Sequence, residues 1–233
     1  MTNTMRTLPR AVFWDMDGTL IDSEPYWREA ELKIAAENGG YWTEELGWEG
    51  SGTLVSSVAA RMVEHGTKLP VGELAQQLVD YVAQREREHV PWIPGVCEVL
   101  TALAQAGVPS ILVTSSPRSM AEAIMAQAPA GAFLDCVSGS DDLPKKPDPA
   151  PYLAAARLLD ITDDKIDEIR ECVALEDSPS GLQSATASGA TTIALSGFTH
   201  FHPADGPQFT TIENYDGVAP EFLGDVVCRR LAQ

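Results

Sequence analysis

AVFWDMDGTL, at residues 11–20, joins a short apolar run to two carboxylates and a glycine. The apolar residues predict a buried strand that ends at Asp15. Gly18 permits a sharp turn directly after the strand, because glycine adopts positive φ at no steric cost. Asp15 and Asp17 would repel each other at the end of a strand, and a bound cation such as Mg2+ relieves that repulsion. The alternative is an ordinary Asp-x-Asp-Gly turn at the protein surface.

Four further apolar runs follow the first one and alternate with stretches of helical periodicity. The predicted strands are 110–114, 134–137, 172–176 and 191–195, and the predicted helices are 95–106, 117–128, 148–159 and 178–188. Strands that alternate with helices predict an α/β fold, in which a parallel sheet is covered on both faces. Ligands of such sheets bind at the carboxyl ends of the strands.

Residues 25–92 interrupt this alternation, because they contain no convincing strand. Their apolar residues recur at helical spacing, which predicts an inserted all-α domain at 25–92. The core domain would then consist of residues 1–24 and 93–233. Prolines near both crossings suit stiff hinges. Aromatic side chains dominate burial, so the tryptophans of the insert are expected to fill its small core. These are Trp27, Trp42, Trp48 and Trp92.

Acidic residues also end a later strand. Glu176 and Asp177 close the predicted strand 172–176, and in a parallel sheet they can meet Asp15 at one edge. Capping of the next helix would explain Asp177 but not both acids together. Lys146, within the sequence KKPDP, could reach these acids and neutralise a phosphoryl group. The alternative for this residue is a solvated loop lysine.

Hydroxyl side chains follow the predicted strand 110–114. Thr114, Ser115 and Ser116 precede Pro117, which suits the first turn of a helix. The free N–H groups at a helix N-terminus bind phosphate, which makes this segment a candidate phosphate site. An ordinary serine cap before proline is the alternative interpretation.

Taken in order, these motifs resemble those of the haloacid dehalogenase-like hydrolase superfamily, in the branch with a helical cap inserted after the first motif. Within it, the chain looks most similar to β-phosphoglucomutase-like enzymes and small sugar-phosphate phosphatases. The resemblance implies a Rossmann-like doubly wound parallel sheet with an inserted α-helical cap domain. The motifs are DMDGTLIDSE (15–24), ILVTSS (111–116), KKPDP (145–149) and ALEDSPSGLQSA (174–185).

The resemblance implies catalytic roles at matching positions. Asp15 would be the nucleophile that forms an aspartyl-phosphate intermediate. Asp17 would be the general acid that protonates the leaving oxygen and then the base that activates water. The hydroxyl of Thr114 and the N–H of Ser115 would bind the phosphoryl group, and Lys146 would balance its charge.

The resemblance also implies a Mg2+ cofactor and a set of substrate contacts. Mg2+ would be held by the Asp15 carboxylate, the Asp17 main-chain carbonyl and Asp177, with Glu176 in support, directly or through water. Substrate choice would lie in the insert and in the segment after Thr114. Residues 47–53, predicted to join two helices of the insert, are either a substrate-selecting loop or a plain turn. The predicted substrate-binding residues are Ser115, Ser116, Arg118, Trp48 and Glu49.

The resemblance favours a Mg2+-dependent phosphatase that hydrolyses a small phosphorylated metabolite, a sugar or polyol phosphate. Asp17 favours phosphoryl transfer over carbon–halogen cleavage, because dehalogenases of the superfamily lack this second aspartate. A phosphosugar mutase is the alternative, but β-phosphoglucomutases carry a histidine where this chain has Trp27. The intact set of acids argues against a non-enzymatic binding protein on the same scaffold.

Charge and composition exclude several partners. A formal net charge of −18 argues against nucleic acid and against anionic membranes. No apolar run approaches the length of a membrane span. The spacings of Cys97, Cys136, Cys172 and Cys228 match no zinc or redox motif, so a reduced, cytoplasmic protein is expected. A monomer is expected, and His200 and His202 are assigned to a surface loop rather than to a metal site, because no third ligand is evident.

Overall fold

The computed structural model describes residues 8–50, 53–199 and 206–233. His200 and His202 lie outside the described residues. Within the described part of the chain, no helix combines the length and apolar character that a membrane crossing requires.

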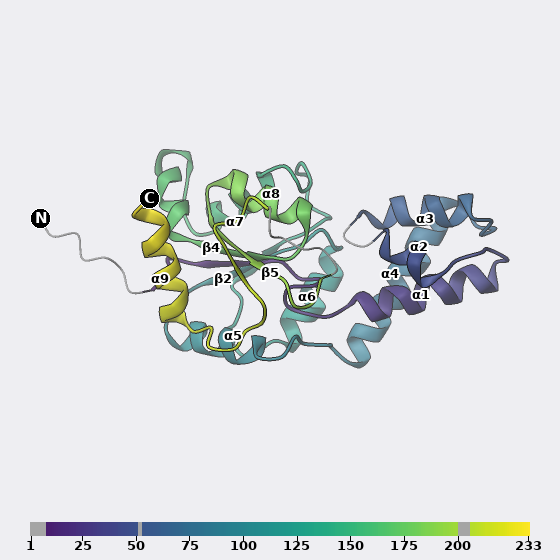
Figure 1. Ribbon diagram of the computed structural model, residues 1–233, viewed down its shortest axis with the longest axis horizontal. Coiled ribbons are helices and arrows are strands. Elements are labelled where there is room, and N and C mark those ends of the chain that lie inside the picture. Colours follow the sequence, from purple (N-terminus) through teal and green to yellow (C-terminus); the bar gives the residue numbers. More distant parts are fainter. Residues whose placement is uncertain (1–7, 51–52, 200–205) are drawn as a thin grey trace, which may run out of the picture. The chain divides into compact units, whose positions relative to one another are not determined.

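The chain divides into two compact units. One consists of residues 1–21 and 92–233, and the other of residues 22–91. The first unit carries the sheet and the second is helical (Figure 1).

The larger unit is built on a six-stranded parallel sheet with the order β3-β2-β1-β4-β5-β6. The chain starts in the middle of the sheet at β1, builds one side with β2 and β3, and then builds the other side. This doubly wound arrangement confirms the predicted α/β fold. The strands are β1 (Val12–Trp14), β2 (Ser110–Val113), β3 (Asp135–Val137), β4 (Val173–Glu176), β5 (Thr191–Leu195) and β6 (Thr210–Ile212).

Helices cover both faces of this sheet. In Figure 1, α7 and α8 lie above the sheet, while α5 and α6 lie below it. A 3-10 segment (Asp163–Glu171) leads into β4. The α-helices are α5 (Val96–Gln105), α6 (Arg118–Gln127), α7 (Ala150–Arg157), α8 (Pro179–Ser188) and α9 (Pro220–Leu231).

The sheet is apolar on both faces, which is why it requires two helical layers. All three residues of β1 are fully buried, and successive side chains of a strand point to opposite faces. Phe13 and Ile111 belong to one core cluster with Tyr152 and Ala155 of α7. Packing of α7 against this face brings the start of α7 close to the carboxyl ends of the central strands.

Among the described residues of the smaller unit, helices are the only regular elements. They are α1 (Glu24–Glu37), α2 (Glu44–Trp48), α3 (Val55–Glu64) and α4 (Val71–Glu88). Its core is mostly aliphatic, with Ile34, Met62, Leu74, Leu78 and Val82 all buried.

The tryptophans do not form that core as expected. Trp42 is buried, but Trp27 and Trp48 are only partly buried, and Trp92 belongs to the larger unit. Leucine, valine and methionine side chains at helical spacing already fill the space between α1, α3 and α4. The prediction of an aromatic core was therefore wrong except at Trp42.

Candidate active site

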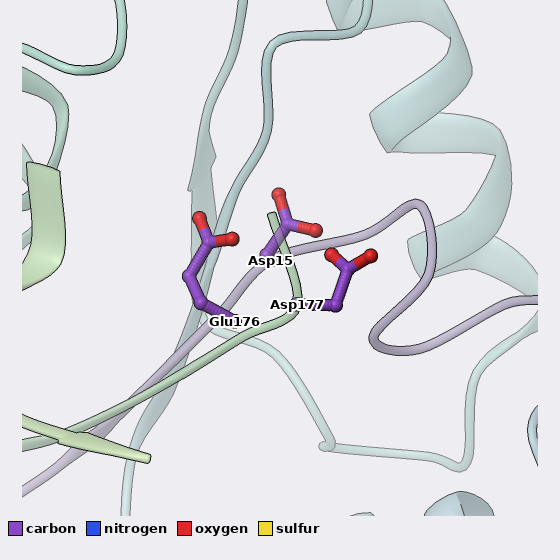
Figure 2. A group of neighbouring side chains, drawn as sticks. All are labelled: Asp15, Glu176 and Asp177. Atoms are coloured by element: carbon purple, nitrogen blue, oxygen red, sulfur yellow. The ribbon is translucent and has the colours of Figure 1, made fainter. Parts of the chain in front are cut away.

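Three carboxylates meet at the carboxyl ends of the two central strands. Asp15 directly follows β1, Glu176 is the last residue of β4, and Asp177 follows it. The strands are paired with Trp14 opposite Leu175, so their ends lie at the same level. Each carboxylate offers an oxygen within 4.8 Å of the others, and Figure 2 shows the three groups converging.

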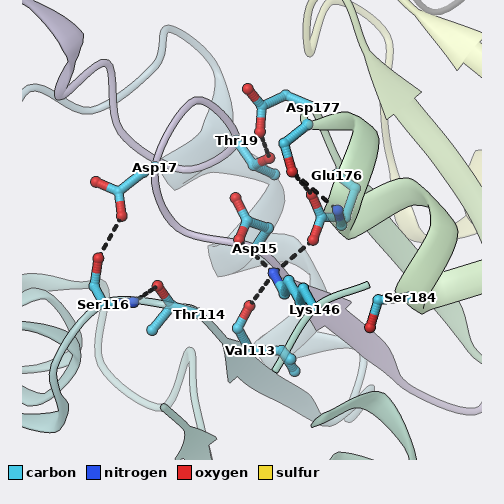
Figure 3. A network of polar contacts seen from close by, with 12 residues as sticks. Asp15, Asp17, Thr19, Val113, Thr114, Ser116, Lys146, Glu176, Asp177 and Ser184 are labelled. Carbon is cyan, nitrogen blue, oxygen red and sulfur yellow. Dashed lines mark hydrogen bonds and ion pairs between the residues drawn. The ribbon is translucent and has the colours of Figure 1, made fainter. Parts of the chain in front are cut away.

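Lys146 binds two of these carboxylates. Its ammonium donates to Asp15 Oδ1 at 2.7 Å, to Glu176 Oε1 at 2.6 Å and to the Val113 carbonyl at 2.9 Å (Figure 3). Its side chain is 4% exposed. The alternative of a solvated loop lysine is therefore wrong.

The charge at this site suits a divalent cation. When all three carboxylates are ionised, they and the one ammonium leave two negative charges. Every atom that the three acids offer to a metal is a hard carboxylate oxygen. Mg2+ prefers such ligands. The residues present therefore fit the magnesium ion that the sequence predicts.

Two glycines allow the acids to approach closely. Gly18 has φ +83°, and a Cβ at this position would lie 2.2 Å from Asp177 Oδ2. Gly181, in the first turn of α8, faces Glu176, and a Cβ there would lie 2.0 Å from its carboxylate. A side chain at either position would displace an acid of the cluster.

Asp17 does not join the three converging carboxylates. Its Oδ2 accepts a hydrogen bond from Ser116 Oγ at 2.7 Å, in the loop that follows β2 (Figure 3). The backbone N–H of Ser116 donates to Thr114 Oγ1 at 3.0 Å, which shapes that loop. Thr114 is buried and Ser115 is exposed. Ser116, expected to contact substrate, thus has a defined partner in Asp17.

Arg118 is paired with the loop that follows β3. Its guanidinium donates to both oxygens of Asp141, at 2.8 and 3.0 Å, and to the Cys136 carbonyl at 3.2 Å. This pairing holds the loop after β3 against the start of α6. A substrate contact through Nη2 of Arg118 would require that ion pair to open, because this nitrogen donates to both oxygens of the carboxylate.

Trp48 and Glu49 are also engaged within their own unit. Trp48 is the last residue of α2, and the Arg28 guanidinium lies 5.1 Å from its ring centroid. Glu49 accepts from Arg61 at 2.6 Å and its side chain is 65% exposed. Residues 47–53 are therefore helical at their start rather than wholly a loop, and 51–52 lie outside the described residues.

Burial controls the protonation of the acids. Burial, and next the charge of Glu176, raise the pKa of Asp15 to about 7, although Lys146 acts in the opposite direction. Burial also raises the pKa of Asp177 well above its ordinary value, and Asp15 and Glu176 add to this rise. Burial alone would lower the pKa of Lys146, but the charges of Asp15 and Glu176 outweigh it and raise that pKa. The lysine therefore stays an ammonium, while a divalent cation would displace protons from the acids.

Mg2+ is expected to stabilise the protein, and more strongly at high pH. Without metal, the free energy of unfolding should fall as the pH rises from about 4 to about 7, because native Asp15 and Asp177 hold protons more tightly than the unfolded chain does. Mg2+ binds the deprotonated acids, so it should raise Tm more at about pH 8 than at about pH 5. Thermal unfolding with and without Mg2+ measures both effects. Asp177→Asn should lose most of the Mg2+-dependent shift, and an equal shift in that variant would contradict the site.

Sequence reasoning missed two tyrosines at this site. The Tyr152 hydroxyl, from α7, donates to Glu176 Oε1 at 2.6 Å. The Tyr215 hydroxyl donates to the Thr19 carbonyl at 2.7 Å, and Thr19 Oγ1 in turn donates to Asp177 Oδ1 at 3.3 Å. Neither tyrosine belongs to a strand end, so only the tertiary fold places them there.

Comparison with known proteins gives one family and several related enzymes. A family model described as haloacid dehalogenase-like hydrolase matches residues 9–189. The chain is 32% identical to a phosphoglycolate phosphatase of Pseudomonas putida, over 85% of this chain and 74% of that protein. It is 28% identical to hexitol phosphatase A of Escherichia coli, over 88% of each chain. Its fold matches a crystal structure of β-phosphoglucomutase from Clostridium difficile with a TM-score of 0.77 at 15% identity, covering 97% of this chain and 100% of that one.

Proposed function

Because the chain belongs to the haloacid dehalogenase-like hydrolases, we propose that it is a Mg2+-dependent phosphatase of a small phosphorylated metabolite, acting through an aspartyl-phosphate. The observation that carries this proposal is the setting of Asp15. Its Oδ1 accepts from Lys146, and Oδ2 accepts no hydrogen bond from any described residue. One oxygen is thus held in place while the other is available to attack phosphorus.

The first half of the reaction uses Asp15 and Asp17. A carboxylate oxygen of Asp15 attacks phosphorus, the bond from phosphorus to the substrate oxygen breaks, and Asp17 donates a proton to that leaving oxygen. In the second half, Asp17 takes a proton from water, which attacks phosphorus and releases inorganic phosphate and free Asp15. The hydrogen bond from Ser116 Oγ holds Asp17 at the side of the loop that follows β2.

Positive charge around the phosphoryl group is supplied by Lys146 and by the metal. Lys146 neutralises charge that builds up on the phosphoryl oxygens, and it orients Asp15 at the same time. A magnesium ion held by Asp15, Asp177 and the main-chain carbonyl of Asp17 would supply further positive charge to those oxygens. Thr114 and the N–H of Ser115 are the proposed hydrogen-bond donors to the phosphoryl group.

The substrate class is proposed from the relatives. Phosphoglycolate phosphatase and hexitol phosphatase A are named for small phosphorylated acids and polyols. A sugar or polyol phosphate therefore remains the proposed substrate of this chain. We also propose that residues 22–91 serve as the substrate-selecting cap, with Trp48 and Glu49 as candidate contacts. Both side chains would then exchange their present partners for substrate groups.

A mutase of the β-phosphoglucomutase type is the second candidate, since the fold is shared with such an enzyme. Trp27 favours hydrolysis, because it occupies the position at which the resembled mutases carry a histidine. The product separates the two candidates. A phosphatase releases inorganic phosphate in a single-substrate assay, whereas a mutase requires a bisphosphate activator and releases little.

A phosphate-release screen over sugar, polyol and short-chain acid phosphates, with Mg2+, tests the proposal. We expect release from at least one class and loss of activity when Mg2+ is chelated. Isomerised substrate without released phosphate would support the mutase instead. Absence of both products over the whole panel would contradict an enzymatic role.

Replacing Asp17 by asparagine should slow hydrolysis in a way that depends on the leaving group. Loss of the general acid should reduce the release of an alkyl alcohol by about 10²- to 10⁴-fold. Formation of the aspartyl-phosphate from p-nitrophenyl phosphate should be slowed much less, because p-nitrophenolate leaves without protonation. The burst of p-nitrophenol in rapid-mixing experiments measures this step. Equal losses for both leaving groups would contradict the assignment of Asp17.

A further inference from the structure

Tyr152 makes a strong polar contact that the proposed chemistry leaves unexplained. Its hydroxyl donates to Glu176 Oε1 at 2.6 Å, and the residue is fully buried. Its ring is held independently of this bond: the Phe13 ring lies 6.3 Å away, centroid to centroid, and the Lys146 ammonium lies 5.3 Å from the ring centroid. A rigid, buried ring therefore aims the hydroxyl at one carboxylate oxygen.

Both oxygens of Glu176 are already engaged by protein groups. Oε1 accepts two short hydrogen bonds, from Tyr152 and from Lys146, each of 2.6 Å. Oε2 accepts from Ser178 Oγ at 3.3 Å. The carboxylate also rests against Gly181, where no side chain could be accommodated. Glu176 is 0% exposed, so no water surrounds these contacts to replace a lost donor.

We propose that Tyr152 is a positioning residue of this site: by sharing Glu176 Oε1 with Lys146, it fixes Glu176 and thereby holds the Lys146 ammonium against Asp15. In this arrangement Glu176 anchors the lysine and does not ligate the metal directly. The metal would rest on Asp15 and Asp177. This inference rests on the proposed phosphatase function and concerns the same site.

The consequence of losing the hydroxyl follows from the charges. Without it, Lys146 is the one donor to Glu176 Oε1 that remains among the described residues. The Glu176 carboxylate is then less strictly oriented, and the ammonium moves with it, away from its position on Asp15 Oδ1. Misplacement of a charged group at the reacting atoms is costly, because catalysis of phosphoryl transfer depends on positioning and electrostatics.

Tyr152→Phe tests this inference, because it removes the hydroxyl and keeps the ring. The kcat should fall by about tenfold or more, the effect expected when a charged acceptor loses one short donor. Inhibition by inorganic phosphate should weaken by a similar factor, since Lys146 also contacts the phosphoryl group. The dissociation constant of Mg2+, measured by calorimetry without substrate, should not increase, because both proposed ligands, Asp15 and Asp177, are kept.

Thr191→Val is the matched control. Thr191 is also fully buried, and its hydroxyl donates to the Arg170 carbonyl at 2.8 Å. It is the first residue of β5, so it lies at the amino end of its strand, away from the carboxyl ends where the acids meet. This variant should lower Tm as Tyr152→Phe does, while kcat and phosphate inhibition stay as in the wild type. If Tyr152 only stabilised the fold, both variants would have a lower Tm but the kcat and phosphate inhibition of the wild type.

Three outcomes would overturn one or the other proposal. Wild-type kcat and phosphate inhibition in Tyr152→Phe would overturn the inference about Tyr152. Weakened Mg2+ binding in this variant would overturn it as well, because Glu176 would then act on the metal. A wild-type protein that releases no phosphate would overturn the proposed function instead, and calorimetric binding of inorganic phosphate to the two variants would still decide the role of Tyr152.

Discussion

Asp15→Asn should abolish phosphate release while the protein stays folded. A carboxamide cannot attack phosphorus or form the acyl phosphate, so kcat should fall by about 10⁴-fold or more, as when other enzymes lose their nucleophile. The thermal stability of the metal-free protein should change little, because Lys146 keeps Glu176 as its partner and because burial already opposes ionisation of Asp15 and raises its pKa to about 7. Phosphate release and thermal unfolding of the purified variant measure the two effects.

Asp225→Asn is the control for the change in charge. Asp225 lies on α9 and is exposed, so its replacement removes the same negative charge from the same unit without touching the acid cluster. Its activity should equal that of the wild type. If Asp15→Asn retained a comparable activity, the nucleophile would have to be another residue, and the proposed mechanism would be wrong.

Lys146→Met should reduce both activity and stability. Methionine has a similar length but no charge, so Asp15 and Glu176 would face each other without the ammonium that separates them. Breaking a buried ion pair in this way costs about 3–5 kcal/mol of stability. Loss of the cation that faces the phosphoryl group should reduce kcat by about 10²- to 10³-fold. Steady-state kinetics and chemical denaturation measure these losses.

The neighbouring lysine provides the control for this substitution. Lys145 is exposed, and its ammonium contacts the Asp141 carbonyl. Lys145→Met should leave kcat and stability close to those of the wild type. The double variant Lys146→Met/Glu176→Gln should recover much of the stability, because it restores the charge balance, but not the activity. Full activity in Lys146→Met would show that the lysine only holds the fold.

The central strands were predictable because their residues are apolar on both faces. The run at 110–114 became β2 (Ser110–Val113), and the run at 191–195 became β5 with the same bounds. The edge strand β6 (Thr210–Ile212) was missed, since a run of three residues that includes two threonines and no buried side chain carries no distinctive pattern. Its backbone bonds to β5 are what make it a strand, and such pairing is a property of the tertiary structure.

The acids at the site were predictable for a topological reason. Asp15 and the pair Glu176-Asp177 end strands that are neighbours in the sheet, so parallel pairing brings them together. The contacts of Lys146 were harder to predict, because this residue follows no strand directly and lies 131 and 30 positions from Asp15 and Glu176 in the sequence. The partners of Arg118 and Tyr152 could not be predicted, because each side chain meets residues that are distant in sequence and belong to no motif.

Trapping of the covalent intermediate tests the central claim most directly. The Asp17→Asn variant should accumulate the aspartyl-phosphate with p-nitrophenyl phosphate and Mg2+, because it lacks the base that activates water. Borohydride reduces an acyl phosphate to an alcohol, so peptide mass spectrometry after reduction should find homoserine at position 15. The modification should require both substrate and Mg2+. Release of phosphate by the wild type, with Asp15 never modified or with the label on another residue, would contradict the mechanism.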